Sequence, residues 1–306
     1  MSTLYIVATP IGNLQDVSLR ALEVLKSVDL VAAEDTRVAQ KLLTAHGISS
    51  RLVSYHQHNA DEKDPRLLEL LQQGQSIAYV SDAGTPLLSD PGHSLVRICY
   101  QHNIPVTAIP GASAVMAAFS INPFNASRFS FEGFLPPKSA ARCERLRQLQ
   151  GETRAIILYE SKHRLLELVS DMITVLGAQR EIMLARELSK LHEQVFYASL
   201  AELGAALNDG RITLKGEFVL ILKGDDGSYA QDERQQQADI LFQQLKTCMS
   251  QRDAVDLAQS LFKLPRNTLK MMAAKHYLFP CLWLISTEPS ALRVLEPPSR
   301  VCTDIR

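Results

Sequence analysis

The sequence has no long hydrophobic run, and its cysteines are few and scattered. Its densest apolar stretch, 277–285, is about nine residues long and contains Pro280, whereas a membrane-spanning helix needs about 20 apolar residues. The N-terminal segment carries no basic stretch and reaches Pro10 after a short apolar run, which excludes a secretion signal. The five cysteines form no Cys-x-x-Cys pair, as is typical of reduced thiols. We therefore expect a cytoplasmic protein without membrane contact.

The common cofactor and catalytic loops are also absent. There is no Gly-x-Gly triplet, which excludes the dinucleotide fingerprint and the glycine loop of Rossmann-type methyltransferases. The chain has no P-loop, no His-Glu-x-x-His and no Gly-x-Ser-x-Gly motif, so the sequence does not favour a nucleotidase, a zinc protease or a serine hydrolase. His56 and His58 alternate without an obvious third ligand, so we expect no metal site.

The chain also lacks an excess of either charge. A net charge of −1 disfavours wholesale wrapping of nucleic acid but leaves room for a local basic surface. With 306 residues, of which 46% are apolar and 21% charged, the chain is of ordinary globular composition and is long enough for two domains.

Short apolar runs alternate with longer helical patterns in the first part of the chain. Runs rich in Val, Ile and Ala predict buried strands at 4–9, 30–33, 76–80 and 105–109. Apolar residues spaced by three and four predict helices at 19–26, 36–45, 65–73 and 94–102. Such βα alternation favours a mostly parallel sheet covered by helices, and we expect this α/β domain to span residues 1–120.

The second part of the chain repeats the α/β pattern with less regularity. Strands are predicted at 128–132, 154–159, 181–184, 194–197 and 217–222, and helices at 140–149, 164–176 and 200–208. The strands at 181–184 and 194–197 have no helix between them, so the sheet of this second domain, residues 121–224, is expected to be mixed.

A different composition follows the second domain. The polar segment 224–237 contains glycine and predicts a linker. Three short helices are expected after it, at 238–248, 253–262 and 267–277. We therefore expect a linker and small helical module over residues 225–276. The tail, 277–306, contains four prolines after Tyr277 and is assigned no fold.

Glycine and proline turns follow three predicted strands directly. These turns are Thr9-Pro10-Ile11-Gly12-Asn13, Ser81-Asp82-Ala83-Gly84-Thr85-Pro86 and Pro110-Gly111-Ala112-Ser113-Ala114. Turns at the carboxyl ends of parallel strands form the crevice in which open α/β sheets bind ligands. Glycine lets the backbone approach such a ligand closely. The sequence thus indicates a ligand site, although tight βα turns without a ligand would look similar.

In this combination the chain resembles the tetrapyrrole-methylase superfamily. It is most similar to the bacterial ribosomal RNA small subunit methyltransferase I family. The resemblance covers about residues 4–222 and rests on eight segments in order. They are Thr9-Pro10-Ile11-Gly12-Asn13-Leu14, Ala33-Glu34-Asp35-Thr36-Arg37, Ser81-Asp82-Ala83-Gly84-Thr85-Pro86, Ile109-Pro110-Gly111, Glu132-Gly133-Phe134-Leu135-Pro136, Tyr159-Glu160-Ser161-Lys162-His163-Arg164, Ala185-Arg186-Glu187-Leu188-Ser189-Lys190 and Lys215-Gly216-Glu217.

The resemblance implies two α/β domains with S-adenosylmethionine in the cleft between them, followed by a small helical module. It also implies 2′-O-methylation of a cytidine ribose in the decoding region of 16S ribosomal RNA, by a homodimer. The cofactor-binding residues that it implies are Pro10, Asp82, Thr85, Ser113 and Ala114 on first-domain turns, with Tyr159, Leu188 and Gly216 in the second domain.

The chemistry of these side chains agrees with such roles but leaves alternatives open. Asp82 suits the sulfonium or the ammonium of the cofactor, and it could equally cap a turn. Leu188 could be ordinary core. Glu160 and Lys190 are the first catalytic candidates, and Asp35 and Glu187 are secondary candidates. A lysine serves as a base only where its pKa is lowered, and such charges also form structural ion pairs.

RNA contact requires positive charge. The segment from Lys138 to Arg154 carries five basic residues and two acidic ones, although a basic run can also be a solvated helix face. The candidate RNA-binding residues are Arg37, Lys138, Arg142, Arg145, Arg164 and Arg186.

Two other functions remain possible at this stage. A methyltransferase for a tetrapyrrole precursor would use the same cofactor platform, but it has little use for the basic segment or the helical module. A non-catalytic RNA-binding assembly protein would have no need of the turns at Pro10, Asp82 and Ser113.

Overall fold

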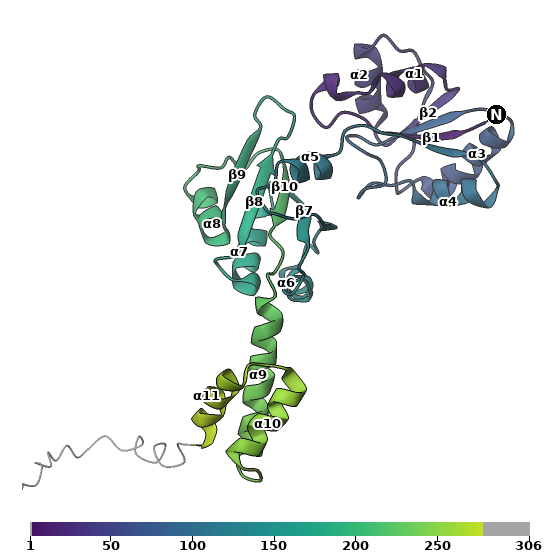
Figure 1. Ribbon diagram of the computed structural model, residues 1–306. Coiled ribbons are helices and arrows are strands. Elements are labelled where there is room, and N and C mark those ends of the chain that lie inside the picture. Colours follow the sequence, from purple (N-terminus) through teal and green to yellow (C-terminus); the bar gives the residue numbers. More distant parts are fainter. Residues whose placement is uncertain (1, 278–306) are drawn as a thin grey trace, which may run out of the picture. The chain divides into compact units, whose positions relative to one another are not determined.

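The computed structural model describes residues 2–277, which form two compact units divided after Asp226. The first unit contains two five-stranded sheets, and the described part of the second unit contains three helices (Figure 1). The tail from residue 278 onward, to which the sequence assigned no fold, lies outside the described residues.

The first sheet is entirely parallel, as the βα alternation predicted. Its strands lie in the order β3-β2-β4-β1-β5. They are β1 (Leu4–Val7), β2 (Leu30–Ala33), β3 (Leu52–Ser54), β4 (Ile77–Val80) and β5 (Val106–Ile109). Every residue of β2 and β4 is buried, because helices cover both faces of the sheet.

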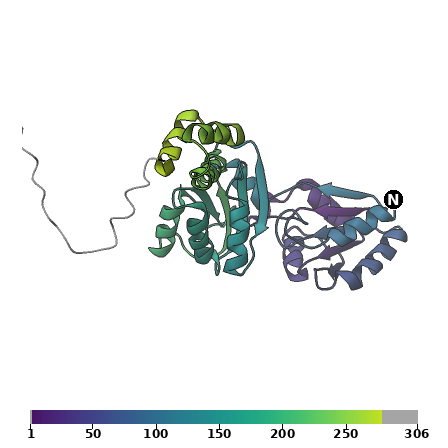
Figure 2. The same ribbon diagram turned by 90° about the horizontal axis from the view of Figure 1, so that it is seen from below.

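Two helices pack on each face of the first sheet (Figures 1 and 2). One face is covered by α1 (Leu19–Ser27) and α2 (Thr36–Ala45), which bury Leu25 and Leu43 against it. The other is covered by α3 (Ala60–Gln72) and α4 (His93–Gln101), which bury Leu71 and Leu95. The carboxyl ends of all five parallel strands are thereby held at one edge of the sheet, where the glycine turns lie.

Two elements of this region differ from the sequence prediction. The short edge strand β3 was not predicted, because its three half-buried residues show no period. Helix α3 begins at Ala60 and contains Pro65, where the sequence placed its start at residue 65. The turn before that proline is held to the sheet by Asp64, which is buried and accepts a hydrogen bond from the Tyr55 hydroxyl at 2.7 Å.

The second sheet is mixed, which confirms the expectation from its two consecutive strands. Its order is β6-β7-β10-β8-β9, with β6 and β7 parallel and the other pairs antiparallel. The strands are β6 (Phe129–Phe134), β7 (Ala155–Ser161), β8 (Glu181–Arg186), β9 (Gln194–Ser199) and β10 (Glu217–Leu222).

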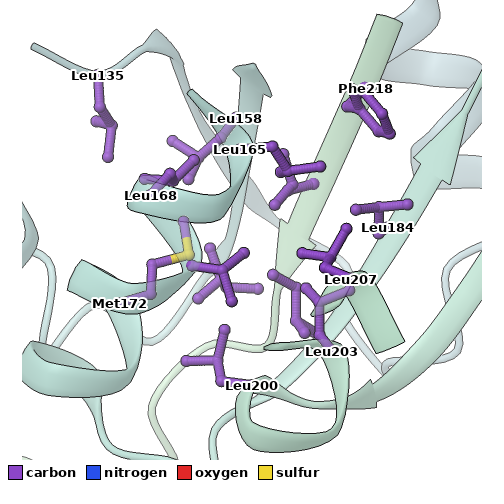
Figure 3. Close-up of a cluster of buried hydrophobic side chains, with 14 of the residues drawn as sticks. Leu135, Leu158, Leu165, Leu168, Met172, Leu184, Leu200, Leu203, Leu207 and Phe218 are labelled. Atoms are coloured by element: carbon purple, nitrogen blue, oxygen red, sulfur yellow. The ribbon is translucent and has the colours of Figure 1, made fainter. Parts of the chain in front are cut away.

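A leucine-rich core lies beneath one face of the second sheet (Figure 3). Helices α6 (Ser139–Gln148), α7 (Leu165–Leu176) and α8 (Leu200–Asn208) supply one side of it, and the strands supply the other. Leu168 and Leu203 meet Leu158 and Leu184 there, all of them without exposed surface. Such burial anchors β7 and β10, whose ends carry candidate site residues.

Helix α5 (Ala114–Ser120) packs on the opposite face of the second sheet. The sequence placed this segment with the first domain, yet Val115 and Ala118 are buried against Ile157 and Val219. The turn that opens α5 follows β5 of the first sheet, so this short helix links the two sheets directly and carries Ser113 and Ala114 between them.

Three helices form the second unit, α9 (Ser228–Leu245), α10 (Gln251–Phe262) and α11 (Arg266–Tyr277). They pack around Phe242, Val255 and Leu269. The prediction of a linker over 224–237 was wrong from Ser228 onward, because that segment is the first half of α9. Glutamine is a good helix former, and the buried side chains that stabilise α9 come later in the helix.

None of the described helices is long and apolar enough to cross a membrane. Residues 2–277 hold no group of three His, Cys, Asp or Glu side chains that could bind a metal ion. The rings of His56 and His58 lie 6.1 Å apart, and His56 Nε2 is 3.3 Å from the side-chain amide of Asn59.

Candidate active site at two adjoining cavities

The turns after β1 and β4 are joined by backbone hydrogen bonds. The Thr9 amide donates to the Gly84 carbonyl at 2.9 Å, and the Gly84 amide donates to the Thr9 carbonyl at 3.0 Å. Gly84 has a φ of 80°, a conformation that glycine adopts without strain. The turn after β5 is tied to the same cluster, because the Thr85 hydroxyl donates to the Ala112 carbonyl at 3.0 Å.

Asp82 joins the turn after β4 to the start of α2. Its Oδ1 accepts a hydrogen bond from the Asp35 amide at 2.9 Å. In return, Glu34 Oε2 lies 3.4 Å from the Asp82 amide, which donates to it. Asp82 therefore caps a turn, as one interpretation of the sequence held, while its side chain also remains exposed toward the adjacent cavity.

A cavity of about 540 Å³ opens beside these turns, large enough for a small-molecule ligand. Both sheets contribute to its wall. Of the residues predicted from sequence, seven line it: Asp82, Thr85, Ser113, Ala114, Tyr159, Glu160 and Gly216. The first cavity thus brings together side chains that are more than 130 residues apart in the chain, from Asp82 to Gly216.

Three acidic residues that line the first cavity, Glu34, Asp90 and Glu217, were not predicted as site residues. Glu34 and Asp90 line it together with Asp82. Burial raises the pKa of Glu34, and the charges of Asp82 and Asp90 add to that rise. Burial likewise raises the pKa of Asp90, partly offset by a hydrogen bond from Ser81. The first-sheet wall is therefore an acidic surface whose ionised form a cationic ligand would stabilise.

The wall from the second sheet is different in character. Burial raises the pKa of the Tyr159 hydroxyl to about 12, so that this phenol stays neutral. Glu160 is buried, and its Oε2 lies 3.2 Å from Arg164 Nη2 as an ion pair, without accepting a hydrogen bond from any described residue. Lys162 and His163 follow on the exposed turn that lines the cavity.

The turn after β8 packs against both Gly12 and Gly216. A Cβ atom at Gly12 would lie 2.2 Å from Lys190 Cγ, and one at Gly216 would lie 2.3 Å from Glu187 Oε1. Glycine at both positions therefore allows the turn to approach. A further hydrogen bond, from the Ser189 hydroxyl to the Asp16 carboxylate, joins the two halves of the first unit at this point.

Lys190 is held as a cation rather than as a base. Burial acts to lower its pKa, but hydrogen bonds to Glu187 at 2.9 Å and Glu217 at 3.0 Å outweigh this effect and raise the pKa. The sequence required a lowered pKa for Lys190 to accept a proton. The structure contradicts that condition, because two carboxylates face the ammonium.

A second cavity of about 300 Å³ adjoins the first. Ile11, Asp82, Ala83 and Glu217 line both cavities. Pro10 lines the second cavity rather than the first, and so does Lys190. Leu188, which the sequence placed at the cofactor, lines neither; it is buried in the cluster around α5, which agrees with the alternative that it is core.

Two of the predicted RNA-binding arginines, Arg142 and Arg186, are buried. The Arg142 side chain is 1% exposed and lies 2.6 Å from Asp171, with Glu167 at 3.5 Å. Arg186 is buried and donates to the backbone carbonyls of Lys215 and His192. A buried guanidinium cannot reach a phosphate, so the structure contradicts these two assignments.

The remaining candidate RNA-binding residues differ in whether their side chains are already engaged in ion pairs and hydrogen bonds. Arg145 pairs with Glu132 at 2.6 Å, and Arg164 donates to the carbonyls of Leu135 and Pro136 as well as facing Glu160. Lys138 is exposed at the start of α6. Arg37 is also exposed, although it pairs with Asp35.

Ion pairs therefore neutralise most of the positive charge in the segment between Lys138 and Arg154. Each of its four arginines faces a carboxylate within 4 Å. These carboxylates lie on α7, on β6 and within the segment itself, so its charge count overstates the positive surface that it provides.

Comparison with known proteins identifies the family. The Tetrapyrrole (Corrin/Porphyrin) Methylases family matches residues 3–204. A protein named ribosomal RNA small subunit methyltransferase I from Pasteurella multocida is 43% identical over 274 residues, which cover 90% of this chain and 97% of that one. The chain belongs to the ribosomal RNA small subunit methyltransferase I family.

A second relative supports the same membership. The protein of that name from Escherichia coli O157:H7 is 50% identical over 221 residues, 72% of this chain and 77% of that one. The resemblance inferred from eight ordered segments is therefore confirmed, and so is a methyltransferase of this family as the class of enzyme.

Solved structures show the same fold at much lower identity. A cobalt precorrin-4 methyltransferase is 16% identical with a TM-score of 0.54, covering 72% of this chain and 94% of that one. A uroporphyrin-III C-methyl transferase from Thermus thermophilus, complexed with S-adenyl homocysteine, is 17% identical with a TM-score of 0.52, covering 72% and 97%. These likenesses confirm the fold class, two α/β sheets of tetrapyrrole-methylase type.

Proposed function

We propose that this enzyme methylates the 2′-hydroxyl of a cytidine ribose in 16S ribosomal RNA, with S-adenosylmethionine as the methyl donor. The observation that carries the proposal is the acidic first cavity. It is lined by turns from both sheets of a chain that belongs to this methyltransferase family.

The residues of the first cavity fit the donor. S-adenosylmethionine carries a sulfonium and an ammonium, and the acidic wall formed by Glu34, Asp82 and Asp90 is complementary to these cations. Ser113, after β5 of the first sheet, and Gly216, before β10 of the second, both belong to the lining. The neutral ring of Tyr159, which stacks edge-on against Phe131 at 5.1 Å, offers an apolar surface for adenine.

The donor supplies a methyl group already activated by the sulfonium. When bound, it would supply that methyl group to the ribose oxygen and keep the carbon–sulfur electron pair on sulfur, so that a base of the protein would have to accept the hydroxyl proton. Glu160 is our candidate for that base, because its buried Oε2 accepts no hydrogen bond from a described residue and it lines the first cavity.

Lys190 takes a different role in this proposal. Because it stays protonated between Glu187 and Glu217, it cannot accept the proton. Lys190 lines the second cavity, where its positive charge is matched by the carboxylates of Glu187 and Glu217. Arg37 and Lys138 are exposed and remain in the proposed RNA surface, together with Arg145 and Arg164 in so far as their ion pairs allow.

The biological setting belongs to the same proposal. The relatives' name supports RNA of the small ribosomal subunit as the substrate. We further propose that the RNA is methylated within the subunit and that the enzyme is a cytoplasmic homodimer. Light scattering of the purified protein at micromolar concentration tests the dimer, and a mass equal to one chain contradicts it.

The decisive experiment uses labelled S-adenosylmethionine with small subunits that lack the modification. Free ribosomal RNA and a tetrapyrrole precursor are tested in parallel. Label at a cytidine ribose in the subunits supports the proposal. Label in the precursor alone would replace it with the tetrapyrrole function, and an absence of cofactor binding by calorimetry would point to a non-catalytic assembly protein.

A further inference from the structure

The two cavities meet at a shared wall. Ile11, Asp82, Ala83 and Glu217 line both of them. A displacement at carbon requires the donor and acceptor atoms to approach within about 3–3.5 Å. Two adjoining spaces with a common boundary provide such an arrangement when one holds the methyl donor and the other holds the acceptor.

The walls of the second cavity differ from those of the first. Besides its shared residues, the second cavity has an apolar lining that includes Leu14, Val38 and Leu42. Its cations are Lys41 and Lys190, of which Lys190 pairs with Glu187 and Glu217. The first cavity carries Glu34, Asp90 and Glu160 instead, against which stands Lys162. An acidic space suits the cationic donor, whereas an apolar space with lysines suits a base attached to a polyanion.

Two apolar side chains of the second cavity are exposed. Leu14, in the short helix η1 (Leu14–Asp16), is 47% exposed, and Val38 on α2 is 37% exposed. Lys41 lies three residues after Val38 on the same helix, so both project from one face. An exposed apolar pair beside a lysine provides packing for a flat ring and a contact for its phosphate.

We propose that the second cavity binds the target nucleoside of the RNA after it has left the base stack. The pyrimidine packs against Leu14 and Val38, Lys41 contacts the adjoining phosphate, and the ribose lies at the shared wall. Enzymes that modify a nucleotide extrude it into a pocket, and single-stranded RNA is read through such splayed bases. This inference rests on the proposed function, because it assigns the first cavity to the methyl donor.

The smaller volume of the second cavity agrees with this division. It measures about 300 Å³ against about 540 Å³ for the first. S-adenosylmethionine combines an adenosine with a methionine and therefore needs more room than one pyrimidine nucleoside. Lys190 closes the second cavity from the second sheet, and Gly12 allows that approach.

The test fills the second cavity without touching the first. Val38→Trp adds a large side chain to the wall of the second cavity alone. Val195→Trp is the matched control, because Val195 is 44% exposed on β9 and lines neither cavity. Each variant is assayed for S-adenosylmethionine affinity by calorimetry and for methyl transfer to unmodified small subunits.

We expect Val38→Trp to raise the KM for subunits at least tenfold, while the Kd for S-adenosylmethionine stays within twofold of the wild-type value. The control should change neither quantity. Leu14→Trp, from a different element, should reproduce the effect if it arises from the cavity rather than from α2. Equal KM values for Val38→Trp and Val195→Trp would overturn the proposal, as would a parallel loss of cofactor affinity.

A second variant tests the phosphate contact. Lys41→Ala should weaken subunit binding about fivefold and make it less dependent on salt, because one phosphate contact is lost. Lys26→Ala, an exposed lysine on α1 outside both cavities, is the control. Identical salt slopes for the two variants would contradict the assignment of Lys41.

Failure of the proposed function is distinguishable from failure of this inference. If the wild-type enzyme transfers no methyl group to subunits or RNA, the function fails. Cytidine 5′-monophosphate binding, observed by ligand-detected NMR in the presence of S-adenosylhomocysteine, then tests the cavity separately. A signal that Val38→Trp abolishes supports a nucleoside site, and a signal unchanged in that variant or absent from the wild type rejects it.

Discussion

The Oδ1 atom of Asp82 lies 2.9 Å from the backbone nitrogen of Asp35 and accepts its hydrogen bond. This contact connects the turn after β4 to the first turn of α2. The same carboxylate faces both cavities. One side chain therefore has two duties, which are to hold two loops together and to present a negative charge to the ligand space.

Substitution of Asp82 can separate those duties. Asp82→Asn keeps an oxygen that accepts from the Asp35 amide but removes the charge, whereas Asp82→Ala removes both. We expect both variants to weaken S-adenosylmethionine binding about tenfold by calorimetry. Only Asp82→Ala should also lower the free energy of unfolding, by about 1 kcal/mol. Wild-type affinity in Asp82→Asn would show that the charge does not contact the cofactor.

Arg142 is expected to contribute to stability rather than to RNA affinity. Its fully buried guanidinium pairs with Asp171 at 2.6 Å. Arg142→Ala should lower the free energy of unfolding by about 3 kcal/mol in chemical denaturation, because a partly buried carboxylate loses its partner. Arg147→Ala, whose exposed pair with Glu144 lies on the same helix, should change it by less than about 0.5 kcal/mol. Equal effects would refute the structural assignment.

The acidic residues that line the first cavity should make the free energy of unfolding depend on pH. Burial raises the pKa of Asp90 in the folded protein above its ordinary value of 3.8. The stability linked to this group is therefore present below the unfolded pKa and is lost as pH rises through the folded pKa. Asp90→Asn should consequently stabilise the ligand-free protein at pH 7.

The matching measurement is denaturation of wild-type and Asp90→Asn protein at several pH values. The difference between them should shrink as pH falls toward the unfolded pKa, where both side chains are neutral. Glu23→Gln, an exposed substitution on α1, serves as the control. A difference that does not change with pH would mean that the Asp90 charge carries no cost in the fold.

The two catalytic candidates should respond differently to conservative changes. Glu160→Gln should lower kcat about 100-fold and abolish the acidic limb of the pH–rate profile. Lys190→Arg keeps the positive charge and should retain kcat within a few-fold. If Glu160→Gln loses rate but keeps the wild-type pH profile, Glu160 positions the turn through Arg164 and does not accept the proton.

Local signals in the sequence were sufficient for most elements of the fold. Helix α2 was predicted at its observed bounds from apolar residues at helical spacing, and in the structure Asp35 caps its first turn, accepting from the Arg37 amide at 2.8 Å. Strand β10 was likewise predicted at its observed bounds. The segment from Ser228 to Gln237 was misread, because polarity and glycine suggest a linker while its glutamines propagate a helix.

Much of the candidate site also followed from the sequence. Parallel strands end at one edge of a sheet, so turns after β1, β4 and β5 had to lie near one another. Asp82, Thr85 and Ser113 accordingly line one cavity. The segments shared with the family added Tyr159 and Gly216 on the opposite wall.

What the tertiary structure alone decided is the environment of each charge. Arg142 looked like a surface residue until packing placed Asp171, 29 residues away, against its guanidinium. Lys190 looked like a possible base until Glu217 was brought to its ammonium by the pairing of β8 with β10. The sequence by itself determined the periodicities, turns and family motifs, because those depend on neighbours in the chain. Burial, ion pairing and the boundary between two cavities depend on residues distant in the chain, so only the folded structure could decide them.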